Sequence, residues 1–372
     1  MEVKQIYDTL NSVVKQSLGT AELTVVDNQG IITLGNTILS SQTNTDNFLN
    51  TLVQRIGKTI ISFREYRSMF SDLYVDDFTW GAIVQKLKVV MPEAEADQSY
   101  ELTDDGTVDM YKISKPEVIQ KLFVTETPYQ FRITIQRVHL EEAFTGENQM
   151  GSFISAIFGE VQNAIELSLE NLGKNCLNNY IAEVSAVPTR AFNLLNMYNT
   201  DTGSSLKVGD AKYNPDFLRY AIGTIKRISR KMVAMSTLYN DGTVTRHTPY
   251  EYQKLFILSD WEQQFETEVQ YSAFNEKYVK LNGFKEIPFL QSAKTPTSIN
   301  IKKASDGTEV TLDNIVGVLC DREALGIYKK QQWSSTTPFN SAGGYYNVYH
   351  HMKELYFNDL SENFVVFYLQ EE

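Results

Sequence analysis

Apolar residues return every three or four positions between Asn148 and Val184, which is the spacing of one buried helical face. No proline interrupts this stretch, so we predict a single helix over 148–184, about 55 Å long at 1.5 Å per residue. The alternative is a pair of helices broken at Gly173, because a glycine inside a helix costs about 1 kcal/mol relative to alanine. Glutamates recur too often along the stretch for a membrane span.

Several shorter segments alternate in polarity or are continuously apolar, as strands do. We predict strands at 83–91, 107–113, 131–140, 254–258, 283–289, 315–320, 345–357 and 364–369. The first two would form a long hairpin over 84–124, with a turn at Asp105-Gly106. The last two are expected to pair with 131–140 beside the long helix. Further helices are predicted to begin at Asn214, as a cap before Pro215, and at Ser259-Asp260.

The first sixty residues are polar and interrupted. Asp27-Asn28-Gln29-Gly30 is typical of a turn, and residues 40–47 form a polar run that we interpret as flexible. The apolar pattern is too sparse for a core of its own, so we predict an arm that packs on neighbouring surfaces. A dense aromatic patch follows between Phe63 and Trp80.

The tip of the predicted hairpin is strongly acidic. Residues 92–109 contain seven acidic side chains and neither lysine nor arginine. A calcium loop of the EF-hand type would place glycine at the sixth position, and that pattern is absent. A solvated or partner-facing charge run is the better interpretation. Because an isolated two-stranded hairpin is marginal in water, it needs a partner surface.

Composition narrows the possible functions. The chain has 372 residues, more than one core usually holds, so two domains or one elongated domain are expected. Its 21 tyrosines and 20 phenylalanines suit large protein contacts as well as cores. The net charge of -12 disfavours nucleic-acid binding as the main role, and the basic face of the 214 helix is interpreted as solvated. Cys176 and Cys320 are expected to be buried free thiols in a chain folded in a reducing cytoplasm.

No motif for catalysis is present. A Gly57-Lys58-Thr59 triplet lacks the glycine that a phosphate loop needs at Leu52. His350 and His351 are neighbours on a strand and should point to opposite faces, so they cannot readily share a metal. We therefore expect no catalytic, cofactor-binding or metal-binding residues, no cofactor and no enzymatic activity.

The order of segments resembles the major capsid proteins of tailed double-stranded-DNA bacteriophages, which have the Hong Kong 97-type capsid fold. Local phrases also look familial, namely 256–261 (FILSDW), 283–289 (GFKEIPF) and 319–327 (LCDREALGI). The resemblance implies an α+β fold with an N-terminal arm at 1–60 and an E-loop at 84–128. It implies a peripheral domain at 61–83, 129–185 and 332–372, with spine helix 148–184, and an inserted axial α/β domain at 186–331.

The resemblance further implies a structural protein that self-assembles, as hexamers and pentamers, into the icosahedral or prolate shell around the phage genome. The expected location is the virion, after folding and assembly in the bacterial host cytoplasm. Expected partners are the chain itself, a separate scaffolding protein and a portal. Packaged double-stranded DNA would face the inner surface without sequence-specific binding, and no membrane is expected. We expect no additional immunoglobulin-like domain after the last strands. The alternatives are an encapsulin nanocompartment shell, a soluble α/β hydrolase and a fibre adhesin.

Overall fold

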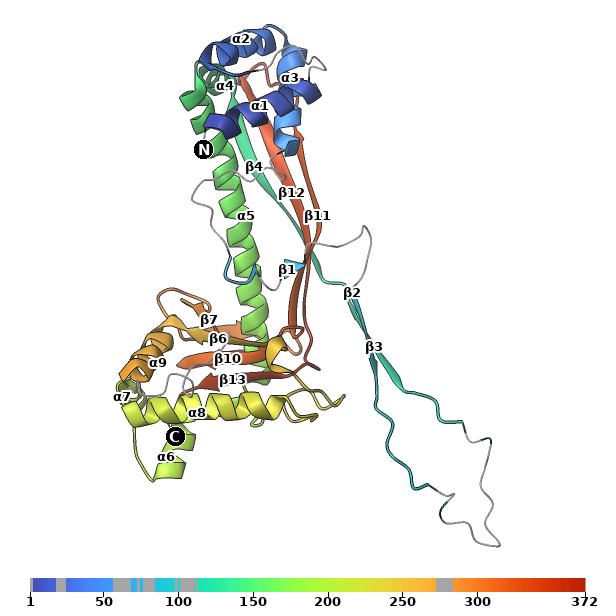
Figure 1. The fold of residues 1–372 in the computed structure, drawn as a ribbon, viewed down its shortest axis with the longest axis vertical. Helices are drawn as coiled ribbons and strands as arrows, with labels where there is room; N and C mark the ends of the chain where they lie inside the picture. The colour runs from blue at the N-terminus through green and yellow to red at the C-terminus, as the bar shows by residue number, and fades with distance from the viewer. Residues whose placement is uncertain are drawn as a thin grey trace. The chain divides into compact units, whose positions relative to one another are not determined.

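The computed structural model describes residues 3–17, 25–55, 68–71, 74–75, 84–97, 100, 111, 113–271 and 284–371. The chain divides into two compact units, each assembled from three segments (Figure 1). The first unit contains residues 1–81, 125–173 and 327–355, and the second contains 82–124, 174–326 and 356–372. The predicted aromatic patch at 63–80 and the predicted turn at 105–106 fall largely or wholly outside the described residues.

The first unit holds three N-terminal helices, the start of the longest helix and a four-stranded sheet. Its elements are α1 (Val3–Ser17), α2 (Asn28–Leu39), α3 (Gln42–Arg55), β1 (Tyr74–Val75), β4 (Glu126–Gln136), α4 (Arg137–Ala143), α5 (Glu147–Val184), β11 (Leu325–Thr336) and β12 (Tyr345–Asn358), of which α5, β11 and β12 continue past the unit boundary.

The second unit holds the hairpin strands β2 (Val84–Val89) and β3 (Val118–Phe123) and a larger α/β assembly. The other elements are β5 (Ala191–Asn193), α6 (Leu194–Thr202), α7 (Val208–Ala211), α8 (Pro215–Met232), the 3-10 helix Tyr250–Tyr252, β6 (Gln253–Leu258), α9 (Ser259–Tyr271), β7 (Phe284–Ile287), β8 (Ile299–Lys302), β9 (Glu309–Leu312), β10 (Ile315–Asp321) and β13 (Phe364–Tyr368).

The long helix predicted over 148–184 is confirmed as α5, which runs unbroken from Glu147 to Val184. Gly173 does not end it. A Cβ at Gly173 would lie 2.9 Å from Cγ of Phe70, a ring that is almost fully buried. The glycine therefore gives Phe70 room to pack against the helix, which explains why a poor helix former stands there.

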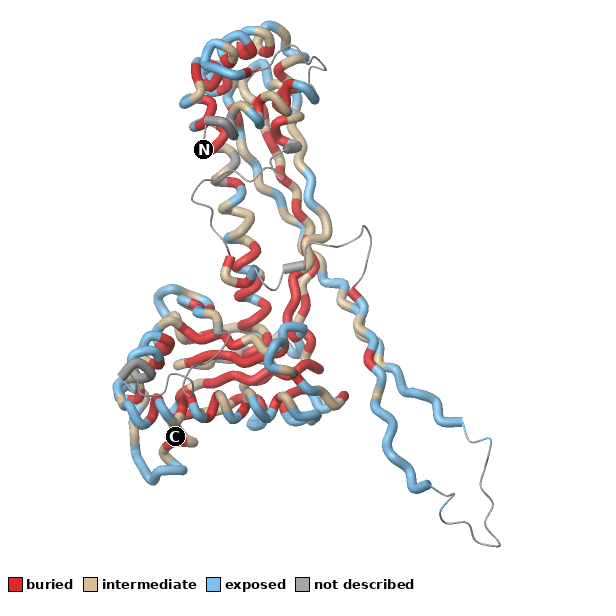
Figure 2. The backbone as a smooth tube through the Cα atoms, in the orientation of Figure 1, coloured by how far each residue is buried: buried red, intermediate tan, exposed pale blue. Residues whose placement is uncertain are grey.

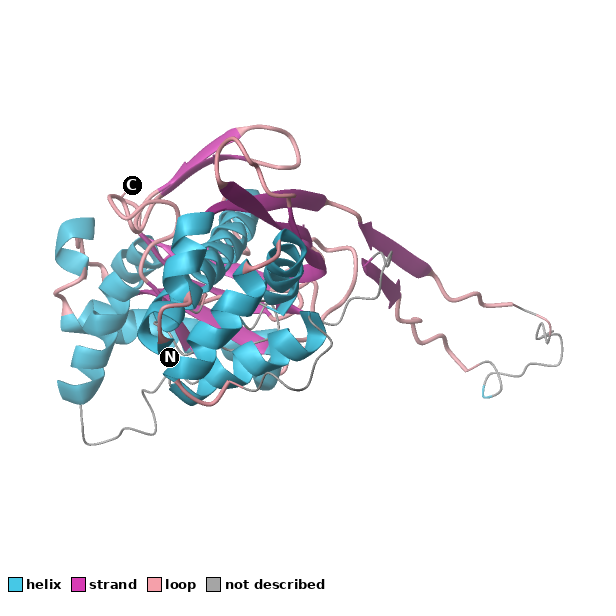
Figure 3. Ribbon diagram, turned by 90° about the horizontal axis from the view of Figure 1, so that it is seen from above, coloured by secondary structure: helices cyan, strands magenta, loops and turns pink. Residues whose placement is uncertain are grey.

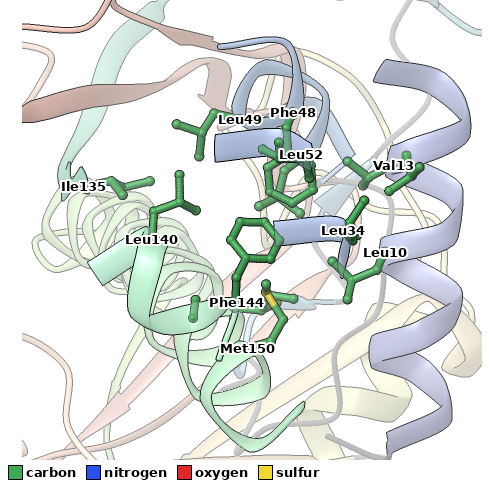
Figure 4. Packing of buried hydrophobic residues seen from close by; sticks show 14 of the residues in the cluster. Leu10, Val13, Leu34, Phe48, Leu49, Leu52, Ile135, Leu140, Phe144 and Met150 are labelled. Atoms are coloured by element: carbon green, nitrogen blue, oxygen red, sulfur yellow. The ribbon is translucent and has the colours of Figure 1, made fainter. Parts of the chain in front are cut away.

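The prediction for the N-terminal sixty residues was wrong about their local structure. Asp27 is the N-cap of α2 and accepts a hydrogen bond from the Gly30 amide, so it begins a helix where a turn was expected. Most of the polar run 40–47 lies in α3. The buried faces of these helices share one core with α4, α5 and the sheet (Figure 4). Its labelled members are Leu10, Val13, Leu34, Phe48, Leu49, Leu52, Ile135, Leu140, Phe144 and Met150.

The sheet of the first unit has the strand order β1-β11-β12-β4. Strand β12 pairs antiparallel with β4 from Tyr345 opposite Gln136 to Leu355 opposite Glu126, which confirms the pairing predicted for the 345–357 strand. The predicted strand 131–140 was too long at its end, because Arg137 begins α4. There Leu140 and Ala143 reach the core at helical spacing. Strand β11 was not predicted.

The sheet of the second unit has the order β5-β13-β10-β6-β7. The strands predicted at 254–258 and 315–320 are β6 and β10, and the 283–289 segment supplies edge strand β7. Asn214 caps α8 by accepting from the Phe217 amide, as predicted.

The partner predicted for the last strand was wrong. Strand β13 pairs with β10 and β5. Its first four residues are all buried, as expected of an interior strand covered on both faces.

Candidate assembly surface

Hairpin β2–β3 confirms the predicted ribbon, and its polarity is partly inverted. The strands pair antiparallel from Val84 opposite Phe123 to Val89 opposite Val118. The return strand predicted at 107–113 falls almost wholly outside the described residues, and the segment that pairs with β2 is β3. Leu87, 63% exposed, and Val89, 56% exposed, lie on the outward face with Val118 and Leu122. Figure 2 colours exposed positions along both strands. Lys86, Lys88 and Lys121 lie on the inward face, beside the buried Val84 and beside Phe123, whose ring stacks on that of Phe357.

The inward lysines converge on one buried carboxylate. Nζ of Lys88 lies 3.1 Å from Oδ2 of Asp359, and Nζ of Lys86 lies 3.3 Å from the same oxygen. Nζ of Lys121 lies 3.3 Å from Oδ1. The side chain of Lys88 is 2% exposed and that of Asp359 is 0% exposed. We call these residues, with Ser361 and Glu362, the Asp359 cluster.

The register explains why an anion is needed at this point. Lys86 stands directly opposite Lys121 in the hairpin, and like charges in that position repel. Asp359 lies within ion-pair distance of both. Glu362 adds a second carboxylate, with its Oε1 3.1 Å from Nζ of Lys88 and 3.3 Å from a guanidinium nitrogen of Arg246. Buried charges arranged in this way compensate one another.

Hydrogen bonds from Tyr180 and Ser361 fix the loop that carries Asp359. The Tyr180 hydroxyl donates to the carbonyl oxygens of Asp359 and Glu362, at 2.8 and 3.2 Å. The amide and hydroxyl of Ser361 both donate to Oδ1 of Asp359. Burial alone would raise the pKa of Asp359, but the Ser361 hydrogen bond and the three lysines together hold that pKa well below its ordinary value. Asp359 is therefore ionised at any physiological pH.

Beyond the paired strands, the described residues 91–97, 111 and 113–117 are exposed. Figure 3 draws the described segments that extend from the paired strands as loops. In this part of the chain Tyr100 and Ile113 are among the most exposed large side chains of the described residues, and Glu93, Glu95 and Asp97 are exposed as well. An apolar ribbon carrying an acidic tip is the kind of surface that proteins place in interfaces.

The histidines and cysteines occupy structural positions. His350 is buried, with its Nδ1 2.7 Å from the Ser334 hydroxyl, and burial, followed by His351, lowers its pKa. His351 stacks on Trp333 on the other face of the strand, as predicted. Both thiols are free and buried, and desolvation raises the pKa of Cys176 to about 12.

Neither a metal site nor a membrane span was found among the residues that the structure describes. Within the described ranges no group of three or more His, Cys, Asp or Glu side chains could hold a metal ion. A search of the same residues found no helix that is both long and apolar enough to span a bilayer.

Sequence reasoning missed the Asp359 cluster. The signal was available in Lys86-Leu87-Lys88, where the period of two puts lysines on the face that should hold apolar residues. The partner carboxylates lie more than 230 residues away along the chain, and no local pattern connects them.

Comparison with known proteins identifies the family. The profile of the Phi29-like phage major capsid protein family matches residues 10–368. The chain is 19% identical over 372 residues to the major capsid protein of Bacillus phage GA-1, covering 98% of this chain and 70% of that protein. It is 23% identical over 375 residues to the major capsid protein of Bacillus phage PZA, covering 98% and 73% respectively.

Solved structures support the predicted Hong Kong 97-like fold. The capsid structure of Staphylococcus phage Andhra matches with a TM-score of 0.58 at 9% identity, over 84% of this chain and 87% of that one. The capsid structure of cyanophage P-SCSP1u matches with a TM-score of 0.51 at 12% identity, over 85% and 92%. The family match does not favour the nanocompartment, hydrolase and fibre alternatives. The chain therefore belongs to the Phi29-like phage major capsid protein family and is a structural subunit of a phage capsid shell.

Proposed function

We propose that this subunit builds the shell through hexameric and pentameric capsomers, and that hairpin β2–β3 is the E-loop, which contacts a neighbouring copy. The partly inverted polarity of the hairpin carries this proposal. Its inward face is neutralised by the Asp359 cluster, while Leu87, Val89, Val118 and Leu122 are exposed on its outward face. An obligate neighbour would remove that apolar area from water at about 25 cal/mol per Å².

The same proposal assigns the parts of the chain. Residues 61–83, 129–185 and 332–372 would form the peripheral domain around spine helix α5, residues 84–128 the E-loop, and residues 186–331 the axial domain. The unbroken course of α5 and the β4–β12 pairing support the peripheral assignment. The N-terminal segment 1–60 would serve as a folded, helical version of the family's arm.

We also propose the partners that such a shell needs. A separate scaffolding protein would guide assembly, a portal would occupy one vertex, and assembly would take place in the cytoplasm of the bacterial host. Packaged double-stranded DNA would face the inner surface without sequence-specific contacts. The net charge of -12 supports a wall that DNA does not adhere to.

The test removes the outward apolar face without touching the lysines. The double variant L87S/L122S keeps the hairpin register and the Asp359 cluster. Loss of two buried leucines from an interface should lower the association constant by at least about tenfold, since 1.4 kcal/mol is a factor of ten. Electron microscopy and sedimentation of the co-expressed head proteins would measure shell formation.

The matched control is V138S, which alters an exposed valine of α4 outside the hairpin. It should assemble as the unsubstituted chain does. A chain that stays monomeric under every condition, or an L87S/L122S variant that assembles normally, would contradict the proposal.

A further inference from the structure

Two unbalanced charge patches lie on the second unit. Helix α8 carries five basic residues and one acidic residue, and α9 carries four acidic residues and no basic one. These two helices pack against each other near the start of α8, where the Phe217 ring lies 6.4 Å from that of Trp261. The net charges of α8 and α9 are therefore opposite in sign, in a chain whose net charge is -12.

The basic patch is the exposed C-terminal half of α8. Arg227, Arg230 and Lys231 are exposed, and in the described part of the chain no carboxylate lies within 4.0 Å of their charged nitrogens. Lys226 lies between them. Its pKa is lowered by burial and then by the charge of Arg230. The cations of this patch therefore repel one another in the isolated subunit.

The acidic patch joins α9 to edge strand β7. Glu266 and Glu286 are exposed, and Glu262 is buried beside them. The pKa of Glu262 is raised by burial and then by the charges of Glu266 and Glu286. None of these three carboxylates forms an ion pair with a described residue of the chain. Among the described residues, no cation forms an ion pair with this patch.

The two patches are too far apart to neutralise each other within one subunit. Arg227 to Lys231 follow Phe217 by ten to fourteen residues, which is about 15–21 Å along a helix. Figure 1 shows α9 beside the first turns of α8, with the last turns of α8 at the far end. Opposite charge at opposite ends of one unit is the arrangement that a head-to-tail contact requires.

We infer that the basic patch of α8 in one copy meets the acidic patch of α9 and β7 in the next copy around a capsomer ring. This inference rests on the proposed ring-forming function and adds the surface that sets the order of subunits in the ring. A heterologous interface needs two different, complementary faces, and these patches supply them. One contact then relieves the repulsion in both.

A second copy of the subunit is a better partner for the basic patch of α8 than a nucleic acid, because it accounts for both patches. DNA could neutralise the basic patch, but it would leave the acidic patch uncompensated and repelled. The neighbouring subunit neutralises both. Ion pairs across a partly exposed interface mainly set specificity and association rate, so capsomer formation should slow as salt screens them.

The experiment reverses each patch separately. R227E/R230E/K231E gives a subunit with two acidic faces, and E266K/E286K gives one with two basic faces. Each variant alone should form capsomers at least about tenfold more slowly than the unsubstituted chain, measured by light scattering and sedimentation with the co-expressed head proteins. Mixed in equal amounts, the two should recover ring formation, because alternating subunits restore opposite charges at every contact.

The mixture has a further signature. An alternating ring closes only with an even number of subunits, so six-membered rings should return while five-membered rings should not. The control K294E/K302E makes the same kind of charge reversal at exposed lysines outside both patches and should assemble normally. Thermal unfolding of each variant checks that it is folded.

The outcomes separate this inference from the proposed function. If the unsubstituted chain assembles and the two patch variants assemble as well as it does, the charge contact is wrong and the shell function stands. If R227E/R230E/K231E assembles normally but shells package less DNA, the basic patch serves the nucleic acid and the inference is overturned. If each variant fails and the mixture fails too while both remain folded, the patches do not face each other.

Discussion

The base and the tip of hairpin β2–β3 place charged side chains in opposite environments. At the base, Lys86, Lys88 and Lys121 turn inward onto Asp359, whose side chain is fully buried. At the tip, Glu93, Glu95 and Asp97 are exposed in a segment without paired strands. The subunit itself thus neutralises the charges of the base, while those of the tip face outward.

This difference teaches how a subunit can present an extended segment. A ribbon fixed at its base by several ion pairs points in one direction, and a segment that is already oriented loses less entropy when it docks. The exposed remainder then provides the contact area. The comparison predicts that substitutions at the base change the stability of the isolated subunit, whereas substitutions at the tip change assembly alone.

The largest expected effect is on the anchor itself. In D359N the amide keeps the size of the side chain but leaves three lysines around a neutral group, and the only fully buried carboxylate among their partners is lost while Glu362, Asp241 and Glu323 remain. Removing one partner of a buried ion pair costs about 3–5 kcal/mol, so the free energy of unfolding should fall by about 3 kcal/mol or more. Urea denaturation followed by circular dichroism measures it.

The control for the anchor is D241N. Asp241 also pairs with Lys121, with its Oδ2 3.3 Å from Nζ, but its side chain is 24% exposed. Such a partly exposed pair is worth about 1 kcal/mol at most. Equal losses in D359N and D241N would show that the cluster is not the anchor of the hairpin.

The second expected effect is a pH dependence with a defined sign. The folded-state pKa of Asp359 lies below its ordinary value of 3.8. Its stabilisation is therefore fully present above the unfolded-state pKa and is lost as pH falls through the folded-state pKa. The difference in unfolding temperature between the unsubstituted chain and D359N should stay constant from about pH 7 to 5 and shrink below about pH 4. A difference that shrinks at neutral pH would contradict the assignment.

The course of the fold was predictable where one pattern extended far enough. The apolar period of 148–184 located α5 within one residue, and the continuous runs at 254–258 and 315–320 located two interior strands of the second sheet. The N-terminal helices were missed because their apolar positions are few and separated by Asn, Thr and Gly, which weaken a helical signal. Their core becomes contiguous only when three helices and the sheet meet.

Local sequence patterns could not predict the pairing of strand β13 or the Asp359 cluster. Strand β13 was assigned to the wrong sheet, since an apolar run indicates burial without naming its neighbour. The ring of Phe70 leaves no room for a side chain at position 173, although the two residues are about a hundred positions apart in the sequence. The lysines of β2 and the carboxylate at 359 likewise meet only after folding, so only the partly inverted polarity of the strand marked them beforehand.

The lysines at the base of the hairpin should differ in how much each contributes to the free energy of unfolding, and this effect is smaller. Lys88 is almost completely buried, while the side chain of Lys121 is 28% exposed. K88M leaves Asp359 with two cations, and the carboxylate of Glu362 loses its nearest partner. The free energy of unfolding should therefore fall by about 2 kcal/mol. K121M should cost about 1 kcal/mol or less. Denaturation of the matched pair tests the order, and a larger loss in K121M would place the centre of the cluster on the wrong lysine.

The smallest effect on stability is expected at the tip, and it is the sharpest test of the comparison. Ile113 is 80% exposed in the described structure, so I113S should change the free energy of unfolding of the isolated subunit by no more than about 0.5 kcal/mol. In the shell the same side chain would be covered by a neighbour, and its loss should slow assembly, measured by light scattering against the V138S control. A loss of stability above about 1 kcal/mol in the isolated subunit would show that the tip packs on its own chain. Unchanged assembly would show that no neighbouring copy covers Ile113. Either result would contradict the distinction between a base that is anchored within the subunit and a tip that contacts another copy.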